Sequence, residues 1–509
     1  MTKSIKLAVG VLIGLIIVII SLLFLNNYAE KKIRESLEKS LKNINATYDK
    51  IDVKVLNRSA ELVNPRITFK GKYLKVDAIK LENIQLWDYL VRKDIIIGNL
   101  NISKPVVKFY NFEKKEADTL NQVKNETSEF KNKVRIKNIA VTGGSFEIFD
   151  KDSTNHRLYT KIEKINLDEV RINAETLKEE IPFDYDLILL NADSIYYDLN
   201  TWQNVSAGNF VIKNNDLLIK RLQLKPKFSK TEHQQNIQVE KDRYDLEIDS
   251  LGITNLTWSI QKDSLQIQND LLEISGAQFY IYRDKTRPDD TSFKPLYSRM
   301  LREAPLKLGI DSLKINNAYL RYDEKINTDR PPGTVEFSKL NASIANLTNI
   351  GLDRKDFPKT MVQAEAKIME AASINAHWEF LINDEEDNFT FSGFMGGLRA
   401  EEINQFLRPA LNIEASGDIT DLYYNFGGNN YNANGEIKLD YKNFKVEVLR
   451  KDGKGKNKVV SAIANLILRN KAVNEKRNYK EISVERDTNK SFWNFLWKCV
   501  RTGALKSFT

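Results

Sequence analysis

The chain has 509 residues and a single cysteine, Cys499, so it cannot form an internal disulfide bond or a cysteine-based metal cluster. Its 77 basic and 69 acidic side chains leave a net charge of +8. Because these charges are interspersed along the chain and are not gathered into one basic segment, nucleic acid is not an expected partner.

The first candidate element is an apolar run at residues 7–25, LAVGVLIGLIIVIISLLFL. A helix that spans a bilayer needs about 20 such residues, whereas the apolar region of a cleaved signal peptide has about 7–15. Asn26-Asn27-Tyr28-Ala29 is a poor cleavage site, so we predict an uncleaved transmembrane helix, with a cleaved signal peptide as the alternative. Lysines and arginines flank both ends, which leaves the orientation open. The predicted anchor residues are Leu7, Val11, Leu15, Val18, Leu22 and Leu25.

Residues 26–50 follow the apolar run and are highly charged. Ile33, Leu37 and Leu41 recur at every fourth position, which places them on one face of a helix. We therefore predict an amphipathic stem helix that leaves the membrane.

Most of the chain, residues 51–440, has the pattern of β-strands. Residues 306–323, LKLGIDSLKINNAYLRYD, are predicted to form two strands joined by a turn at Asn316-Asn317. Beyond that turn, Leu320 and Tyr322 alternate with polar neighbours, which is typical of a sheet with unlike faces. Similar segments occur at residues 134–150 and 267–284, with predicted turns at Gly143-Gly144 and Ser275-Gly276. In a third, at residues 97–110, Pro105 stands where the turn would be, which fits a sheet edge or a break between strands.

The apolar positions of these copies are the candidate binding residues, and they have two interpretations. In a β-sandwich or barrel they would form a closed core. In an open sheet they would line an apolar groove. The groove candidates are Phe146, Ile148, Phe279, Ile281, Leu320 and Tyr322.

The pattern changes near the C-terminus. Residues 441–490 are predicted to form a separate terminal segment of strand and helix, and residues 491–509 an amphipathic, tryptophan-rich helix. Trp493, Leu496, Trp497 and Val500 fall at helical spacing and make one stripe. This stripe would either cap the sheet or contact a membrane or partner, because tryptophan beside cationic residues suits a membrane interface.

The sequence contains no motif for catalysis, metal binding or nucleotide binding. The three histidines, His156, His233 and His377, lack the spacing of a zinc site. There is no GxSxG or Walker A motif, and the run KDGKGK at residues 451–456 is predicted to be a hairpin turn. We therefore expect neither an enzyme nor a cofactor.

Several segments resemble the AsmA-like proteins of Gram-negative envelopes, especially single-anchor versions from Bacteroidetes-type bacteria. They are the apolar run, the strand-Pro-strand element at 97–110, residues 306–349, the segment GLRAEEINQFLRPALNIEASGDITDLYYNFGG at 397–428, residues 441–471 and the tryptophan-rich tail. The resemblance covers most of the chain, but its motifs are diffuse and mark no catalytic residue. It implies a cytoplasmic N-terminus at residues 1–6, an inner-membrane anchor and a periplasmic remainder.

The same resemblance implies kinship with bridge-like lipid-transfer proteins. The expected fold is therefore mainly β: a transmembrane helix followed by an elongated, curved, repetitive β-sheet groove with a few short helices. The expected function is to carry or bridge phospholipid or another envelope lipid from the inner membrane, with the outer membrane or another envelope protein as a further partner. The alternative is a structural or assembly factor for outer-membrane proteins that transfers no lipid.

Overall fold

The computed structural model describes residues 46–450 and 479–508, except for 55–56, 70, 86–87, 89–90, 93, 111–132, 151–153, 180 and 262–263. The predicted anchor at 7–25 and most of the predicted stem helix therefore lie outside the described residues. The last part of that stem prediction is wrong, because β1 (Ala46–Thr47) and the start of β2 (Lys50–Lys54) are extended. No helix in the described part of the chain is long and apolar enough to cross a membrane.

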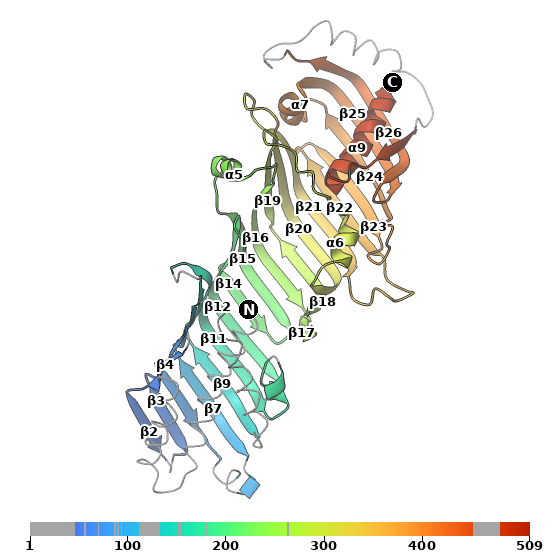
Figure 1. Ribbon diagram of the computed structural model, residues 1–509. Coiled ribbons are helices and arrows are strands. Elements are labelled where there is room, and N and C mark those ends of the chain that lie inside the picture. Colours follow the sequence, from blue (N-terminus) through green and yellow to red (C-terminus); the bar gives the residue numbers. More distant parts are fainter. Residues whose placement is uncertain are drawn as a thin grey trace. The chain divides into compact units, whose positions relative to one another are not determined.

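The prediction of a mainly β protein with few helices is confirmed. Contacts divide the chain into two compact units, residues 1–220 and 221–509 (Figure 1). The predicted segment boundary at residue 440 lies inside a strand, β26 (Asn432–Val448). That strand continues because the same neighbour, β25 (Ile413–Gly428), pairs with it from Val448 to Ala433.

The strands of the first unit form one mixed sheet. In addition to β1 and β2 they are β3 (Ser59–Val63), β4 (Arg66–Phe69), β5 (Lys72–Lys75), β6 (Ala78–Glu82), β7 (Ile95–Ser103), β8 (Val106–Tyr110), β9 (Val134–Thr142), β10 (Ser145–Phe149), β11 (His156–Ile172), β12 (Leu187–Asp198), β13 (Gln203–Ala207), β14 (Asn209–Lys213) and the start of β15 (Asp216–Pro226). Neighbours are antiparallel except for β7 with β9 and β8 with β10.

The second unit repeats this arrangement. Its strands are the remainder of β15, β16 (Arg243–Thr254), β17 (Thr257–Gln261), β18 (Ser264–Ser275), β19 (Gln278–Asp284), β20 (Lys307–Lys325), β21 (Gly333–Thr348), β22 (Thr360–Ile368), β23 (Ala372–Phe380), β24 (Phe389–Arg399), β25, β26 and β27 (Lys480–Glu485). From β20 to β27 each strand pairs antiparallel with the next, whereas β18 and β19 both run parallel to β20.

Within the described residues, four helices accompany the second sheet: α5 (Lys230–Asn236), α6 (Tyr297–Arg302), α7 (Asn404–Leu411) and α9 (Phe492–Phe508). The predicted C-terminal helix is therefore present as α9, which packs on β26 and β27. Helix α6 lies in the connection from β19 to β20. A parallel pair of strands requires such a long crossover.

The three predicted turns are wrong, because each lies at a kink between stretches of strand that continue in the same direction. At Pro105 the chain does break, between β7 and β8, and both strands run in one direction beside β9 and β10. β20 passes through Asn316-Asn317 without reversing, and β18 and β19 keep one register against β16 on both sides of Gly276. The same holds for β9 and β10 along β11 around Gly143-Gly144. Glycine and asparagine, which adopt a positive φ readily, occur in β-bulges as well as in turns. The sequence around each kink therefore looks like that of a turn.

The four copies are nevertheless equivalent in structure. Each copy has a residue with a positive φ at its kink: Lys104 at 46°, Gly143 at 67°, Gly276 at 65° and Asn317 at 50°. Copies lie side by side in parallel pairs, the first two in one unit and the last two in the other. Each unit is therefore built around one pair of identically kinked strands.

Candidate functional site

The kinked strands share one spacing of apolar side chains. Ile95 and Val134, for example, are paired in register, and the same spacing then recurs along both strands. Successive apolar positions in each kinked strand lie two residues apart, except for one step of three and one step of five. At those two steps the regular pairing with the neighbouring strand is interrupted. The side chains at equivalent positions are Ile95, Ile97, Leu100, Ile102, Val107 and Phe109; Val134, Ile136, Ile139, Val141, Phe146 and Ile148; Ile267, Asn269, Leu272, Ile274, Phe279 and Ile281; and Leu308, Ile310, Leu313, Ile315, Leu320 and Tyr322.

These positions belong to apolar rows that cross successive strands. Directly paired residues lie on the same face of a sheet, so an unbroken series of pairs traces a row on that face. In the first unit one row consists entirely of aliphatic residues: Ile51, Leu62, Ile79, Ile102, Val141, Ile165, Leu190, Ile212 and Leu217.

Two rows cross the second unit from β16 to the C-terminal strands. The first contains Ile253, Leu272, Leu313, Ile344, Val362, Trp378, Phe391, Phe426, Gly435 and Ile482. The second contains Leu251, Ile274, Ile315, Ala342, Ala364, Ala376, Gly393, Tyr424 and Ile437. We call the surface formed by these two rows the apolar face of the second unit.

The six candidate binding residues fall into two separate groups. In the second unit Phe279 pairs with Leu320 and Ile281 pairs with Tyr322, so the four side chains adjoin on one face. In the first unit Phe146 and Ile148 pair with Val107 and Phe109. The candidates thus occupy equivalent positions in the two units.

Their surroundings distinguish an open face from a closed core. Phe279, Ile281, Leu320 and Tyr322 are all half-buried, as are most residues of the second-unit rows between β20 and β24. Within the described residues of each unit, the strands belong to a single sheet and no second sheet packs on the apolar rows. The sandwich interpretation, which requires a facing sheet, therefore has no support in the described part.

The first unit has a closely packed cluster on its sheet. Its buried cluster includes Ile79, Leu100 and Ile102, each at most 1% exposed. Leu177, Phe183 and Tyr185, which follow β11 in the chain, pack against this cluster. Burial decreases along the aliphatic row, and its last four residues, from Ile165 to Leu217, are only half-buried.

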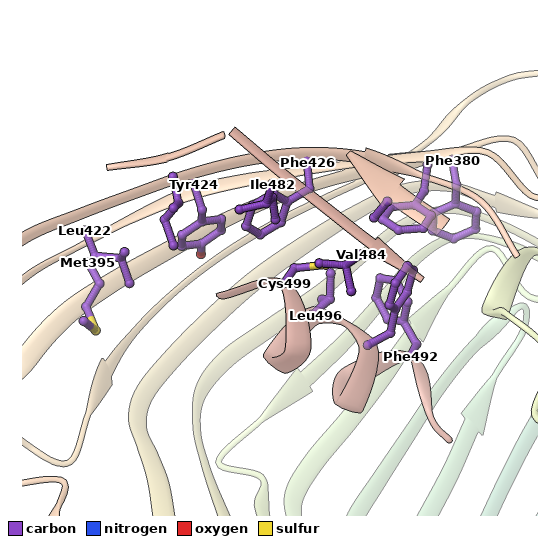
Figure 2. Packing of buried hydrophobic residues seen from close by; sticks show 14 of the residues in the cluster. Phe380, Met395, Leu422, Tyr424, Phe426, Ile482, Val484, Phe492, Leu496 and Cys499 are labelled. Carbon is purple, nitrogen blue, oxygen red and sulfur yellow. The ribbon is translucent and has the colours of Figure 1, made fainter. Parts of the chain in front are cut away.

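Helix α9 covers one end of the apolar face of the second unit. Phe492, Leu496 and Cys499 point toward sheet residues that include Phe426, Ile482 and Val484 (Figure 2). The approach is close at Gly503, where a Cβ atom would come within 2.1 Å of Ile437 Cγ2. The apolar side chains of these strands are therefore covered by a helix and not by a second sheet.

The predicted stripe on this helix is divided between packed and exposed residues, and its contact with a membrane or partner stays a prediction. Leu496 is only 6% exposed and Val500 packs against the cluster, but Trp493 and Trp497 are 56% and 43% exposed. The packing face is instead formed by Phe492, Phe495, Leu496 and Cys499. The packing face differs from the stripe because the sheet contacts a side of the helix that is rotated away from Trp493 and Trp497.

A row of charged residues lies beside the apolar positions of β16, β19 and β20. Two residues along the chain from Tyr244, Ile281 and Tyr322 are Asp242, Arg283 and Glu324. Arg283 donates two hydrogen bonds to Asp242 at 2.6 and 2.8 Å. Burial raises the pKa of Tyr244 and of Tyr322. Burial alone would lower the pKa of Arg283, but its pairing with Asp242 raises it. These charged residues therefore form a fixed polar border along one side of the apolar positions.

The described residues contain no arrangement that suggests catalysis. His156 contacts Glu147, His377 contacts Glu379 and His233 contacts the Lys241 carbonyl oxygen, each at a separate place. No group of three or more metal-ligating side chains occurs in the described part. A shallow hollow of about 510 Å³ across β20–β23 has a mixed lining of Lys314, Ile315, Asn316, Asn341, Ala342, Ser343, Gln363, Ala364, Glu365, Asn375, Ala376 and His377.

The fold and site therefore define a mainly β protein whose sheets each have one apolar face. No protein-family model matches the chain, and no curated protein sequence matches it either. Sequence reasoning missed the aromatic residues Trp378, Phe391, Phe426 and Phe492. The signal that would have found them is the pairing of β22 through β26, which sequence alternation alone does not reveal.

Proposed function

We propose that this protein is a membrane-anchored, non-enzymatic lipid carrier or bridge of the Gram-negative envelope. In this proposal residues 7–25 hold it in the inner membrane, the remainder lies in the periplasm, and the sheets form an elongated, curved groove for phospholipid or another envelope lipid. The observation that carries the proposal is the unbroken series of apolar rows on a face that no second sheet covers within the described residues.

The physical mechanism is passive. Moving one CH₂ group from water to an apolar surface is favourable by about 0.8 kcal/mol, so an acyl chain is retained on the apolar face. When it slides along a row, each CH₂ that leaves one apolar side chain meets the next, and the free energy changes little. Headgroups stay at polar borders such as the row of Asp242, Arg283 and Glu324. Direction comes from lipid supply or from partners at either membrane.

A pair of neighbouring substitutions tests this function. Leu320 lies on the same face of the sheet as Phe279, Ile281 and Tyr322, whereas Tyr280 lies on the opposite face and is 38% exposed. We expect Leu320→Asp to abolish lipid transfer between vesicles while circular dichroism shows a folded protein, and Tyr280→Asp to leave transfer unchanged. If Leu320→Asp unfolds the protein, the side chain belongs to a closed core, because an unpaired buried charge costs several kcal/mol.

Lipid that co-purifies with the wild-type protein, identified by mass spectrometry, provides an independent test. Its loss from Leu320→Asp and retention in Tyr280→Asp would support the carrier. A folded Leu320→Asp protein with normal lipid content and normal transfer would contradict it. Absence of lipid from the wild type, together with defective outer-membrane protein assembly in a null strain, would favour the scaffold alternative.

A further inference from the structure

Phe492, the first residue of α9, fills an aromatic recess on β23 and β24. Its ring stacks on Trp378 with a centroid distance of 4.8 Å and an interplanar angle of 22°. It also meets the edges of Phe389 and Phe391 at 5.2 and 6.4 Å. With 3% of its surface exposed, Phe492 is enclosed as a core residue would be, although it comes from a terminal helix. We call this site the Trp378 recess.

The Trp378 recess lies directly on the first apolar row of the second unit. Trp378 follows Val362 and precedes Phe391 in that row. An acyl chain extended along the row would therefore reach the position that Phe492 occupies. Phe492 and a hydrocarbon chain are alternative occupants of the same apolar space.

A polar atom in the recess lacks a partner. The indole Nε1 of Trp378 is buried and makes no hydrogen bond. A buried tryptophan N–H normally finds an acceptor, and only an acceptor can satisfy it. The phenyl rings of Phe492, Phe389 and Phe391 offer none, and the Tyr297 hydroxyl accepts from the Trp493 indole. The carboxyl or ester oxygen of a lipid is an acceptor attached to an apolar chain, which matches both features of the recess.

Polar contacts hold α9 in place over the recess. In the segment that connects β27 to α9, Lys490 Nζ lies 3.2 Å from Glu240 Oε1 and 2.8 Å from Asp289 Oδ2. Within α9, Lys498 and Lys506 donate to the carbonyl oxygens of Glu485 and Glu481 at 2.7 and 3.0 Å. Lys490 thus links the start of α9 to two segments of the chain more than 200 residues earlier.

We propose that α9 is a displaceable cover and that the Trp378 recess beneath it binds the acyl chain of a lipid, with the Trp378 N–H donating to the lipid's carboxyl or ester oxygen. Displacement exchanges one apolar occupant for another, and it gives the unpaired N–H an acceptor. This inference rests on the proposed lipid-carrying function and adds to it a specific site and a mechanism of access.

Cys499 provides a built-in reporter of the cover. It is the chain's single cysteine, it lies on the packing face of α9, and it is 0% exposed. Burial raises the pKa of its thiol to about 12, so the covered thiol reacts slowly. We would label the full chain, held in an amphipathic polymer without detergent, with N-ethylmaleimide and follow the mass. Dodecanoate below its micellar concentration should accelerate labelling at least tenfold, and an unchanged rate would overturn the proposal.

Variants test the displacement of α9 and the binding of lipid in the Trp378 recess separately. Lys490→Ala should accelerate labelling without ligand, whereas Lys359→Ala, which removes an ion pair with Glu379, should not. Phe492→Ala should bind dodecanoate about tenfold more tightly, whereas Leu505→Ala, at a 58% exposed position of the same helix, should not. Trp378→Phe should weaken dodecanoate binding several-fold. If Phe492→Ala fails to fold, the rates at which N-ethylmaleimide labels Cys499 in the wild type and in Lys490→Ala still test whether α9 is displaceable.

The outcomes also distinguish this inference from the function on which it rests. If vesicle lipid transfer depends on Leu320 while Cys499 stays protected under all conditions, the carrier stands and the displaceable cover is wrong. If dodecanoate exposes Cys499 but the wild-type protein transfers no lipid, the recess and its cover stand and the transport function is wrong.

Discussion

Gly276 lies so close to Asp249 on the neighbouring strand that a Cβ atom at position 276 would approach Asp249 Oδ2 to 2.1 Å. Gly276 also has a φ of +65°, at the kink where β18 becomes β19. Both facts make glycine the favoured residue at this kink.

We expect Gly276→Ala to lower the free energy of unfolding by about 1–2 kcal/mol, the cost of a left-handed conformation for an L-residue. Gly252→Ala on β16 is the matched control, because no atom lies within 4 Å of its added Cβ. Chemical denaturation of both variants would measure the difference. Equal stability of the two variants would contradict a strained kink at position 276.

The aliphatic row of the first unit allows a graded test of burial. Ile102 is 1% exposed and Ile212 in the same row is half-buried. Ile102→Ala should cost about 2–4 kcal/mol because it leaves a cavity, and Ile212→Ala about 1 kcal/mol or less. Shifts of the urea midpoint would show the contrast. Similar costs at both positions would mean that the two ends of the row are equally enclosed.

The kinks explain how much of the fold could be predicted from the sequence. Alternation correctly indicated a mainly β chain with repeated, unlike-faced segments, and helical spacing correctly indicated α9. The repeats were mistaken for hairpins because Asn317, Gly276 and Gly143 favour positive φ, which turns and bulges both require. Only the pairing partner, about 40 residues away in the chain, distinguishes a reversal from a kink.

The candidate site was predicted in part for a similar reason. Phe279, Ile281, Leu320 and Tyr322 could be placed on one face because each alternates within its own strand. Trp493 and Trp497 were chosen as contact residues by their size and spacing, but which face of α9 is buried depends on the sheet beneath it. The contact of Phe492 with Trp378 joins residues more than 100 positions apart, so no local pattern could reveal it.

Glu147 gives the first unit a measurable pH dependence. Burial by itself raises the pKa of Glu147, but hydrogen bonds with His156 and Ser145 and the charge of Lys108 lower it below the ordinary 4.5. A carboxylate with a depressed pKa stabilises the folded state above its unfolded pKa, and this contribution is lost as the pH falls through the folded value.

We therefore expect Glu147→Gln to destabilise the protein by about 1–2 kcal/mol at pH 7 and by progressively less below pH 4.5. Glu163→Gln, at an exposed position of β11, should have little effect at any pH. Thermal unfolding at several pH values would measure both. A constant difference between wild type and Glu147→Gln from pH 7 to pH 3 would contradict the assignment.

Lys498 and Lys506 cover backbone carbonyl groups of β27, which pairs on one side with β26. A strand edge with uncovered backbone groups is a template for pairing with another chain. The double variant Lys498→Ala/Lys506→Ala should therefore self-associate, seen as a several-fold rise in light scattering. Lys445→Ala, an exposed lysine on β26, should remain unchanged. A double variant that stays as dispersed as the control would show that these lysines do not protect the edge.

The apolar rows run across the strands, so their length depends on how many strands a sheet has. Neighbouring strands are about 4.8 Å apart, so the nine paired residues from Ile51 to Leu217 span about 38 Å, which exceeds the roughly 30 Å of a bilayer's hydrocarbon core. Adding another kinked pair of strands would lengthen such a row by about 10 Å without altering any existing contact. Evolution can therefore set the reach of a protein of this kind by duplicating segments of about 55 residues, the span of one kinked pair from Ile95 to Phe149, independently of the chemistry that each segment presents.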